Sequence, residues 1–386
     1  MKLNKKYIAL NNLIILQRGF DLPEIQRVIG NIPVVASTGI IGSHNIAKVK
    51  GPGVVIGRSG SIGGGQYVAG DFWPLNTTLW VKDFKEHNPR FIYYVLKNID
   101  FSRFNFGTGV PTLNRNHIAN IKVLAFDKSQ EEKIADILSK YDDLIENNRR
   151  RIELLERSAR LLYKEWFVRL RFPGHEHTPI IDGIPEGWKY LKLEEVISDI
   201  IDYRGKTPKK LGGDWSNSGI PALSALNVKN NQLINLDKCK FVNESLYEKW
   251  MKTELQKYDI LMTSEAPLGE LYYLTSEQKF CLSQRLYAIR ANVDVIKPAM
   301  LFCTLLTPKT QAEIHSRETG TTVFGIRQSA LREISILVPS IELQELATET
   351  LDSIFEQKEV LQKQNQKLKQ ARDILLPKLM NGEIEV

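Results

Sequence analysis

Apolar residues recur at alternating steps of four and three in two stretches, which is the spacing of a coiled-coil seam on an α-helix. The first stretch covers residues 134–166, and the second lies 213 positions later, at residues 347–379. Leu138, for example, corresponds to Leu351. The pattern predicts two similar long helices, and a chain that repeats itself.

Local signals predict where these helices begin and end. Residues 129–132 follow the Ser-x-x-Glu pattern of a capping box, and Pro173-Gly174 stops the first helix. Pro339-Ser340 opens the second helix. Pro377 has no amide hydrogen to donate, so it predicts an end or a kink in the last turn and makes Leu379 a weaker seam member.

Polar residues interrupt both seams. Asn148 is fifth of ten in the first seam and Asn365 is sixth of ten in the second, so antiparallel helices bring them face to face at the centre. A facing pair fixes register, whereas a single buried amide costs stability. We therefore predict an antiparallel intramolecular coiled coil with Asn148 beside Asn365. The alternative is that each asparagine is merely tolerated at a hydrated seam. Lys358 and Arg372 also fall on the second seam.

The repeat continues outside the helices, but its offset changes. The growth of the offset from 188 to about 206 places an insertion at residues 227–254. Two heads that share a scaffold and differ in loops are expected where loops carry different specificities. The matched strings are 32–33 with 220–221 (offset 188), 54–60 with 260–266 (offset 206), 75–80 with 282–287 (offset 207) and 108–109 with 319–320 (offset 211).

Each head mixes strands and helices, so the fold class is α+β. We expect two mixed α/β heads separated by two long helices in an antiparallel coiled coil, with a pseudo-twofold internal repeat. The expected strands include 53–56, 78–81, 271–274 and 287–289, and the expected short helices are 89–98 and 298–306. The expected domains are residues 1–127 (first head), 128–172 (central helix), 173–339 (second head) and 340–386 (C-terminal helix).

Bulk composition narrows the class of protein. A chain of 386 residues with 42% hydrophobic and 25% charged residues is expected to form more than one core. No apolar run approaches the ~20 residues that span a bilayer, and the N-terminus does not resemble a signal peptide. Cys239, Cys281 and Cys303 lie far apart, as reduced thiols of a cytoplasmic protein do. The net charge of +7 permits binding to nucleic-acid phosphates.

Several strings together resemble the specificity (S) subunits of type I restriction–modification enzymes, and the resemblance covers essentially the whole chain. It is strongest at Thr108–Ile118 and at three strings of the first helix: 130–135, 148–152 and 162–167. The strings at 17–23 and 184–188 are similar to the usual openings of the two heads.

The resemblance implies a non-catalytic DNA-recognition subunit. Each head would read one half of a bipartite site in double-stranded DNA, and the paired helices would set the gap between the halves. The helix from 134 to 166 is ~48 Å long, or ~14 base pairs. Two methyltransferase subunits would carry S-adenosylmethionine and methylate adenine, so this chain would hold no cofactor or metal of its own. Two translocating nuclease subunits would complete a restriction complex.

Base readout needs hydrogen-bonding side chains on loops that reach the grooves, while phosphate contacts only position the protein. Such residues stand at strand ends and in polar turns of both heads. The candidates in the first head are Arg18, Arg58, Ser59, Asn76, Thr77, Thr78, Arg103, Thr108 and Thr112. Those in the second head are Arg204, Lys206, Thr263, Ser264, Gln284, Arg285, Thr319, Thr321, Thr322, Arg327 and Gln328.

Two other functions, an enzyme and a structural spacer, make different predictions for the sequence and for DNA binding. An enzyme needs a catalytic motif, and each partial match has a simpler explanation as a turn, a linker or chance. A structural spacer between two proteins would show no salt-dependent affinity for DNA, whereas phosphate-bound complexes weaken steeply with salt. The partial motifs are Asn88–Phe91 (a methyltransferase-like NP motif), Gly51–Gly65 and Gly205–Thr207 (phosphate loops), Asp259 with 277–279 (a nuclease pattern), and His175–His177 (a metal site).

Overall fold

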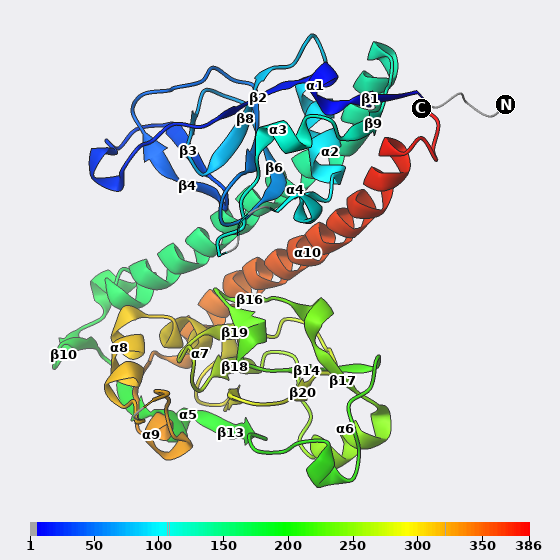
Figure 1. Cartoon of the computed structure of the whole chain (residues 1–386). Coiled ribbons are helices and arrows are strands. Elements are labelled where there is room, and N and C mark those ends of the chain that lie inside the picture. The colour runs from blue at the N-terminus through cyan, green and yellow to red at the C-terminus, as the bar shows by residue number, and fades with distance from the viewer. Residues whose placement is uncertain (1–5, 106, 108, 321) are drawn as a thin grey trace. The chain divides into compact units, whose positions relative to one another are not determined.

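The computed structural model describes residues 6–105, 107, 109–320 and 322–386 (Figure 1). The chain divides into two units, of which unit 1 comprises residues 1–148 and 364–386 and unit 2 comprises residues 149–363. Each unit contains one head together with a segment of both long helices, α4 (Lys128–Tyr163) and α10 (Ile341–Met380).

Unit 1 is built on a four-stranded antiparallel sheet in the order β2-β8-β5-β6, beside a three-stranded sheet in the order β4-β3-β7. In the second sheet β3 runs antiparallel to β4 and parallel to β7. The strands are β1 (Tyr7–Ala9), β2 (Ile15–Arg18), β3 (Ile32–Ala36), β4 (Gly39–His44), β5 (Gly53–Gly57), β6 (Gly63–Val68), β7 (Trp73–Pro74), β8 (Thr78–Asp83) and β9 (Lys122–Leu124), which pairs with β1. The helices are α1 (Leu10–Leu13), η1 (Glu24–Gln26), α2 (Pro89–Asn98), η2 (Phe101–Phe104) and α3 (Arg115–Ile118).

Unit 2 repeats this topology. Its sheets have the orders β13-β21-β18-β19 and β17-β14-β20, and β14 again runs parallel to its third strand. The strands of these sheets are β13 (Ile197–Asp202), β14 (Ile220–Leu223), β17 (Lys240–Val242), β18 (Ile260–Thr263), β19 (Leu271–Tyr273), β20 (Cys281–Leu282) and β21 (Leu286–Ala291). Strand β12 (Lys189–Lys192) pairs with β22 (Ser335–Val338), and β10 (Ile180–Ile181) with β11 (Ile184–Pro185). The helices are α5 (Leu193–Val196), η4 (His175–His177), η5 (Lys209–Leu211), α7 (Pro298–Leu305), α8 (Pro308–Ser316) and α9 (Gln328–Arg332). The internal repeat is therefore a repeat of fold.

The insertion of unit 2 falls where the offsets placed it, but a shared strand divides it in two. One part holds η6 (Ala225–Asn227), β15 (Val228–Lys229), β16 (Gln232–Leu233) and η7 (Leu236–Lys238). The other part is α6 (Glu244–Trp250), and β17 lies between them. The turn residues Asn230 and Asn231 have φ values of 49° and 57°, which asparagine tolerates better than most residues.

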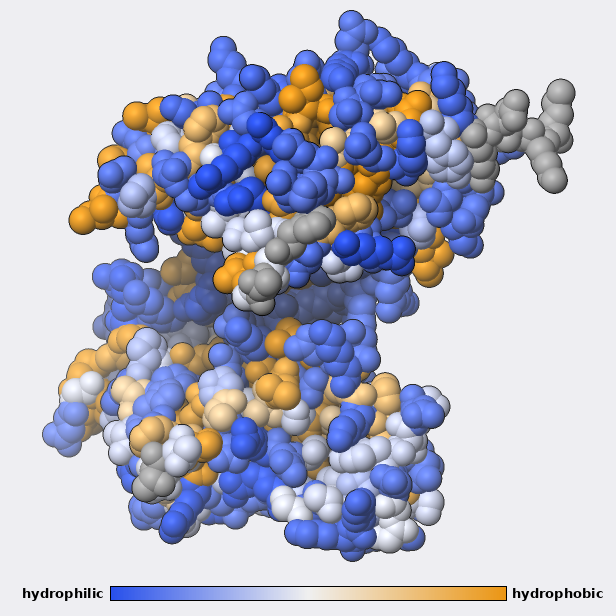
Figure 2. Space-filling view, in the orientation of Figure 1, coloured by the Kyte–Doolittle hydropathy of each residue, from blue (hydrophilic) through white to orange (hydrophobic). Residues whose placement is uncertain are grey.

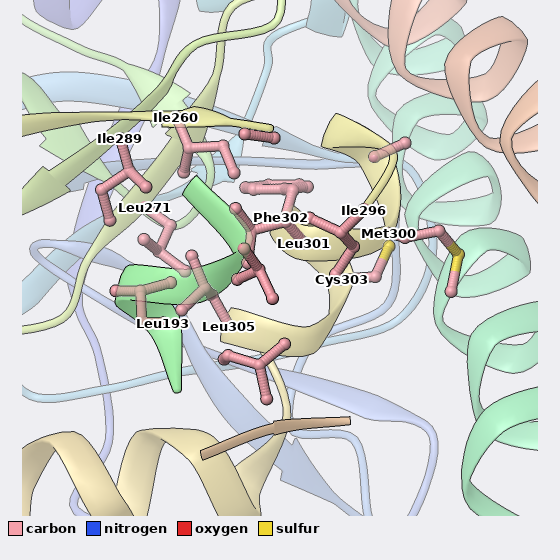
Figure 3. Packing of buried hydrophobic residues seen from close by; sticks show 14 of the residues in the cluster. Leu193, Ile260, Leu271, Ile289, Ile296, Met300, Leu301, Phe302, Cys303 and Leu305 are labelled. Atoms are coloured by element: carbon pink, nitrogen blue, oxygen red, sulfur yellow. The ribbon is translucent and has the colours of Figure 1, made fainter. Parts of the chain in front are cut away.

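Each unit has its own core. In unit 1, Phe91, Ile92 and Val95 of α2 pack with Val54 and Ile56 of β5. In unit 2, helix α7 is buried on all sides, and Figure 3 shows its side chains beside residues of the neighbouring strands. Each such side chain contributes about 1.5–3 kcal/mol when fully buried. On the face seen in Figure 2, hydrophobic residues are interspersed with hydrophilic ones. No helix among the described residues is long and apolar enough to cross a membrane.

The two long helices pair antiparallel, as the seams predicted. In unit 1, Asn148 Nδ2 donates to Asn365 Oδ1 at 3.0 Å, and Arg372 Nη1 lies 2.5 Å from Asp142 Oδ1. In unit 2, Lys358 Nζ lies 2.7 Å from Glu156 Oε1. The residue numbers of these pairs add to 513 or 514, which is the signature of antiparallel register. The polar interruptions of the second seam thus each face a polar partner on α4. The pairs are 148 with 365, 142 with 372 and 156 with 358.

Two expectations about helix ends were wrong, the Ser129–Glu132 cap of the first helix and an end of the second helix at Pro377. The cap of α4 is Asp127 with Gln130, whose side chains each accept from the other's backbone amide at 2.8 and 3.2 Å, so Ser129 lies inside the helix. At the other end, α10 continues through Pro377 to Met380, and Leu379 is buried at 2% exposure. Proline costs one helical hydrogen bond, and the core contacts of Leu379 outweigh that loss.

The end of the first seam also differs from the expectation. The α-helix stops at Tyr163 and continues as a π-helical turn, Lys164–Val168. The wider turn shifts the register by about one residue. Phe167 is consequently buried against Trp188, at 5.8 Å between ring centroids, while Trp166 is only partly buried.

Two offsets from the sequence comparison need correction. Leu75 N–H donates to Val35 O, and Ser283 N–H donates to Leu223 O, both at 2.8 Å. Leu75 therefore corresponds to Ser283, an offset of 208 and not 207. A shift of one residue in a strand moves every side chain to the opposite face of the sheet. The alignment based on residue similarity therefore matched side chains that lie on opposite faces.

The glycines before the last loop of each head also shift the alignment. A Cβ on Gly107 would lie 1.8 Å from Val110 O, and a Cβ on Gly320 would lie 2.1 Å from Val323 O. These matched close approaches give an offset of 213, equal to that of the long helices, in place of 211.

Candidate nucleic-acid interface

One edge of the four-stranded sheet of unit 1 collects the polar residues of several segments. Arg18 ends β2 opposite Leu79, and Gly57 ends β5 opposite Thr78, where β8 begins. Because neighbouring strands are antiparallel, the ends of β2 and β5 and the start of β8 meet at one edge.

Backbone hydrogen bonds bring two loops to this edge. Arg58 N–H donates to Thr77 O at 2.8 Å, and Leu113 N–H donates to Arg58 O at 2.8 Å. Ser59 forms an isolated antiparallel bridge with Thr112. The polar edge of unit 1 consists of Arg18, Arg58, Ser59, Asn76, Thr77 and Thr112.

The side chains of this edge are partly preorganised. Arg58 Nε donates to Asn76 O at 3.1 Å, and the amide of Asn76 donates to Asp21. Burial of Arg58, and after it the positive charge of Arg18, lowers the pKa of the Arg58 guanidinium. Within the described residues, no carboxylate lies at ion-pair distance from either arginine.

Unit 2 assembles the same edge from equivalent bonds. Ser264 N–H donates to Arg285 O at 2.9 Å, and Ile326 N–H donates to Ser264 O at 3.0 Å. Glu265 bridges Gly325, as Ser59 bridges Thr112. The polar edge of unit 2 consists of Asp202, Arg204, Ser264, Glu265, Gln284 and Arg285.

Both arginines of this second edge are paired with acids. Arg285 Nε lies 3.2 Å from Glu265 Oε1. Arg204 donates from Nε and Nη2 to Asp202 at 2.9 and 2.8 Å, and its guanidinium lies 4.2 Å from the ring centroid of Tyr287. Burial is the largest single influence on Arg204 and lowers its pKa, but the hydrogen bond to Asp202 and the nearby Tyr287, Asp202 and Glu265 together raise the pKa above its ordinary value.

Some of the predicted contact residues are buried and are not exposed for contact with DNA. Thr78 and Thr263 are fully buried, and Ser264 is 1% exposed. The Thr78 hydroxyl donates to Leu75 O at 2.7 Å, and the Thr263 hydroxyl accepts from Glu270 N–H at 2.9 Å. The Thr78 and Thr263 hydroxyls therefore stabilise the backbone next to the polar edges.

The remaining candidates lie around the two edges. Arg103 of η2 pairs with Asp100 at 3.3 Å, and Lys206 Nζ donates to Trp250 O at 2.8 Å. Thr319, Thr322 and Arg327 are exposed. Thr108 and Thr321 lie outside the described residues.

The structure adds residues that the sequence did not single out. Arg115 Nη1 donates to Leu16 O at 3.4 Å, as Gln328 Nε2 donates to Ile200 O at 3.1 Å. The offset of 213 links Arg115 to Gln328 and could have revealed it. Asp202 and Glu265 also belong to the edge of unit 2, although an acidic residue beside DNA is not an obvious candidate.

The partial enzyme motifs have structural roles. Asn88 caps α2 by accepting from Arg90 N–H at 2.9 Å and Phe91 N–H at 3.2 Å. Asp259 is buried and paired with Arg290 at 2.7 Å. His175–His177 form the short helix η4. No group of three or more His, Cys, Asp or Glu side chains among the described residues is placed to hold a metal ion.

Two α+β heads of one topology, each with a polar edge and each tied to a segment of two long helices, define a duplicated recognition protein. The family model for the type I restriction modification DNA specificity domain matches residues 15–157 and 185–370, well over half of the chain. The chain belongs to this family. It is therefore a DNA-specificity subunit and not a catalytic one.

Individual relatives agree. The type I restriction enzyme MjaIX specificity subunit of Methanocaldococcus jannaschii is 26% identical over 305 residues, covering 77% of this chain and 69% of that protein. The HindI specificity subunit of Haemophilus influenzae is 22% identical over 71% of each chain. The crystal structure of the S subunit of a type I system from M. genitalium shares the fold, with a TM-score of 0.67, 18% identity, and coverage of 98% of this chain and 96% of that one.

Proposed function

We propose that this chain selects the DNA site of a type I restriction–modification complex, with the first head (1–127) and the second head (173–339) each reading one half of a bipartite site. The observation that carries the proposal is the polar edge, which the same strands and loops assemble once in each unit. Equivalent scaffolds with different side chains suit two half-sites of different sequence.

The residues of these edges have the chemistry of groove readout. Arginine donates a bidentate pair to guanine, and asparagine or glutamine pairs with adenine. Both kinds of side chain occur in each edge, at Arg58 and Asn76 in unit 1 and at Arg285 and Gln284 in unit 2. The exposed loops 109–112 and 322–325 border these positions. The net charge of +7 favours phosphate contacts alongside them.

We further propose that the long helices set the number of unread base pairs between the half-sites. Helices α4 and α10 contain 36 and 40 residues. At ~1.5 Å per residue they are roughly 54 and 60 Å long. A paired helix changes its length only by whole residues, so it is a suitable spacer of fixed length.

The same helices offer a surface for partner subunits. Five aliphatic residues of the long helices are 46–61% exposed. All five occupy the third position of their heptad, counted from the seam residue that begins it. In unit 2, Leu154 and Val360 lie at one level of the helix pair, because their numbers add to 514 as those of Glu156 and Lys358 do. Exposed aliphatic rows of this kind favour docking of another helix. In unit 2 the row consists of Leu154, Leu161, Leu346 and Val360, and Ile374 of unit 1 stands at the same heptad position.

In this proposal the partners are double-stranded DNA, two methyltransferase subunits and, in a complex that restricts, two translocating nuclease subunits. The methyltransferase subunits bring S-adenosylmethionine and transfer its methyl group to adenine. This chain contributes the choice of site and the docking surface, and it acts in the cytoplasm.

The test is to co-express the chain with the methyltransferase subunit of its own locus and to map methylated adenines by sequencing. We expect a two-part motif with a fixed unread gap. A continuous motif, or a stable complex that methylates no defined site, contradicts the proposal.

Two altered chains separate the heads from the spacer. Inserting one heptad into each long helix adds about 10 Å, or roughly three base pairs, and keeps the seam in phase. The gap should lengthen while both half-sites stay the same. Replacing residues 1–127 by another head of the family should change one half-site and leave the gap unaltered.

A further inference from the structure

The two polar edges share a backbone but differ in charge. The matched hydrogen bonds make Arg58 equivalent to Ser264, and the matched bridges make Ser59 equivalent to Glu265. Arg18 stands opposite Leu79 as Asp202 stands opposite Tyr287. Unit 1 therefore carries two guanidinium groups at positions where unit 2 has a hydroxyl and a carboxylate.

The pairing of these charges also differs. Each arginine in the edge of unit 2 has a carboxylate partner, Asp202 for Arg204 and Glu265 for Arg285. Within the described residues, neither Arg18 nor Arg58 has one. Burial and the charge of Arg18 both disfavour the ionised form of Arg58, so its pKa is lowered. Two close like charges without an acid are stabilised when an electron-rich ligand arrives.

The Arg58 side chain is anchored by a hydrogen bond, whereas no hydrogen bond of the Arg18 side chain is found among the described residues. Arg58 Nε donates to Asn76 O at 3.1 Å, and Asp21 accepts from the amide of Asn76. Arg58 as a whole residue is half-buried, and Arg18 is exposed. Because the planar guanidinium of Arg58 is already anchored at Nε, it loses little conformational freedom when it binds a ligand. Such a group is better suited to a hydrogen-bonded pair with a base than to a non-directional charge contact with a phosphate.

We propose that Arg58 is a specificity-determining residue of the first head, donating a bidentate pair to guanine O6 and N7 in its half-site. Arg18 neutralises a neighbouring phosphate. This inference rests on the proposed function, and it predicts that the half-site of the first head contains a guanine whose recognition depends on Arg58 alone. In the second head Ser264 occupies the equivalent position, so that half-site uses different chemistry.

The first experiment needs no variant. The complex of the full chain with its methyltransferase subunit is titrated onto duplexes in which each guanine of the motif is replaced in turn by 7-deazaguanine, which lacks the N7 acceptor. Replacement of one guanine in the half-site assigned to the first head should lower affinity by about 5-fold or more, but by less than the roughly 150-fold upper limit of a whole bidentate contact, because O6 remains as an acceptor.

The second experiment repeats the titration with variants. Arg58→Ala should remove the preference for that guanine and should bind the normal and the 7-deaza duplex equally. Arg18→Ala should weaken all duplexes alike and reduce the salt slope by about one. The matched control is Arg285→Ala in unit 2, which should leave the guanine preference of the first half-site intact. Arg58→Lys keeps the charge and shows whether the planar fork is needed.

The outcomes distinguish the two ideas. A bipartite motif whose first-head half-site contains no guanine, or shows no 7-deazaguanine effect, overturns the role of Arg58 and leaves the proposed function standing. A 7-deazaguanine effect that survives in Arg58→Ala also overturns it. Absence of any bipartite motif in the unaltered complex overturns both.

Discussion

The facing asparagines of the coiled coil allow a quantitative test of what holds the helices in register. Asn148 and Asn365 are 5% and 7% exposed, and their amides are joined at 3.0 Å. Asn365 Nδ2 also donates to Ile145 O at 3.3 Å. A slide of one heptad would place Asn365 against Tyr141 or Leu155 and leave the Asn148–Asn365 bond broken.

Replacing one partner should cost more than replacing both. Asn148→Leu leaves Asn365 Oδ1 without its donor, and an unsatisfied buried polar group costs about 1–3 kcal/mol. Asn365→Leu should cost a similar amount. The double replacement removes both polar groups and buries apolar atoms, so it should be neutral or stabilising by about 1 kcal/mol. The double variant should, however, tolerate a shifted register.

The measurement is native-state hydrogen exchange of the helix amides near positions 148 and 365, because local opening reports this contact without assuming that a chain of two units unfolds in one step. The four proteins form a double-mutant cycle. The control is Asn147→Leu, at the exposed neighbouring position, which should stay within about 0.5 kcal/mol. Single variants as stable as the parent, or a double variant whose cost equals the sum, would refute the reasoning.

Three further predictions concern the helices. Lys358→Met should destabilise unit 2 by about 2 kcal/mol, less than a fully buried pair, because Glu156 keeps 18% exposure; Glu156→Gln in the same chain should restore thermal stability. Burial raises the pKa of Asp352 to about 6, and its unfolded value is near 3.8, so the folded chain keeps a proton that the unfolded chain has released between pH 4 and 6. Stability measured by thermal melts should therefore fall as pH rises through that window, and Asp352→Asn, which still accepts from Tyr273, should flatten the fall. Leu154→Ser with Val360→Ser should weaken capture of the methyltransferase subunit at least tenfold at unchanged melting temperature, whereas Arg157→Ser should not; equal binding by both would remove these residues from the docking surface.

Similarity of sequence located the repeat but misaligned parts of it. The helices carry strong periodic signals, so their pairing and the facing asparagines followed from spacing alone. Strands give weaker signals, and offsets of 207 and 211 had to become 208 and 213 once hydrogen bonds were known. A one-residue error is invisible in a short apolar run, yet it reverses the face of every side chain.

The candidate contact residues were identified by type and by position near strand ends, and all six residues of the polar edge of unit 1 are among them. This reasoning could not distinguish Arg58 from Arg285. Arg58 is anchored to a backbone carbonyl and has no carboxylate partner among the described residues, whereas Arg285 forms an ion pair with Glu265. The same reasoning also could not show that Thr78, Thr263 and Ser264 point inward. Burial and pairing depend on which chain segments meet, and those segments lie up to tens of residues apart.

The duplicated α+β plan, the antiparallel helix pair and the family follow from the order of residues, because periodic spacing and repeated strings can be recognised without knowing which residues are in contact. The charge of each polar edge follows only from the folded structure. Asp202 and Glu265 neutralise the arginines of unit 2, whereas no carboxylate among the described residues pairs with Arg18 or Arg58 of unit 1, and burial and then the charge of Arg18 lower the pKa of Arg58. Electrostatic character depends on distances between side chains, which the fold sets and the order of residues alone does not.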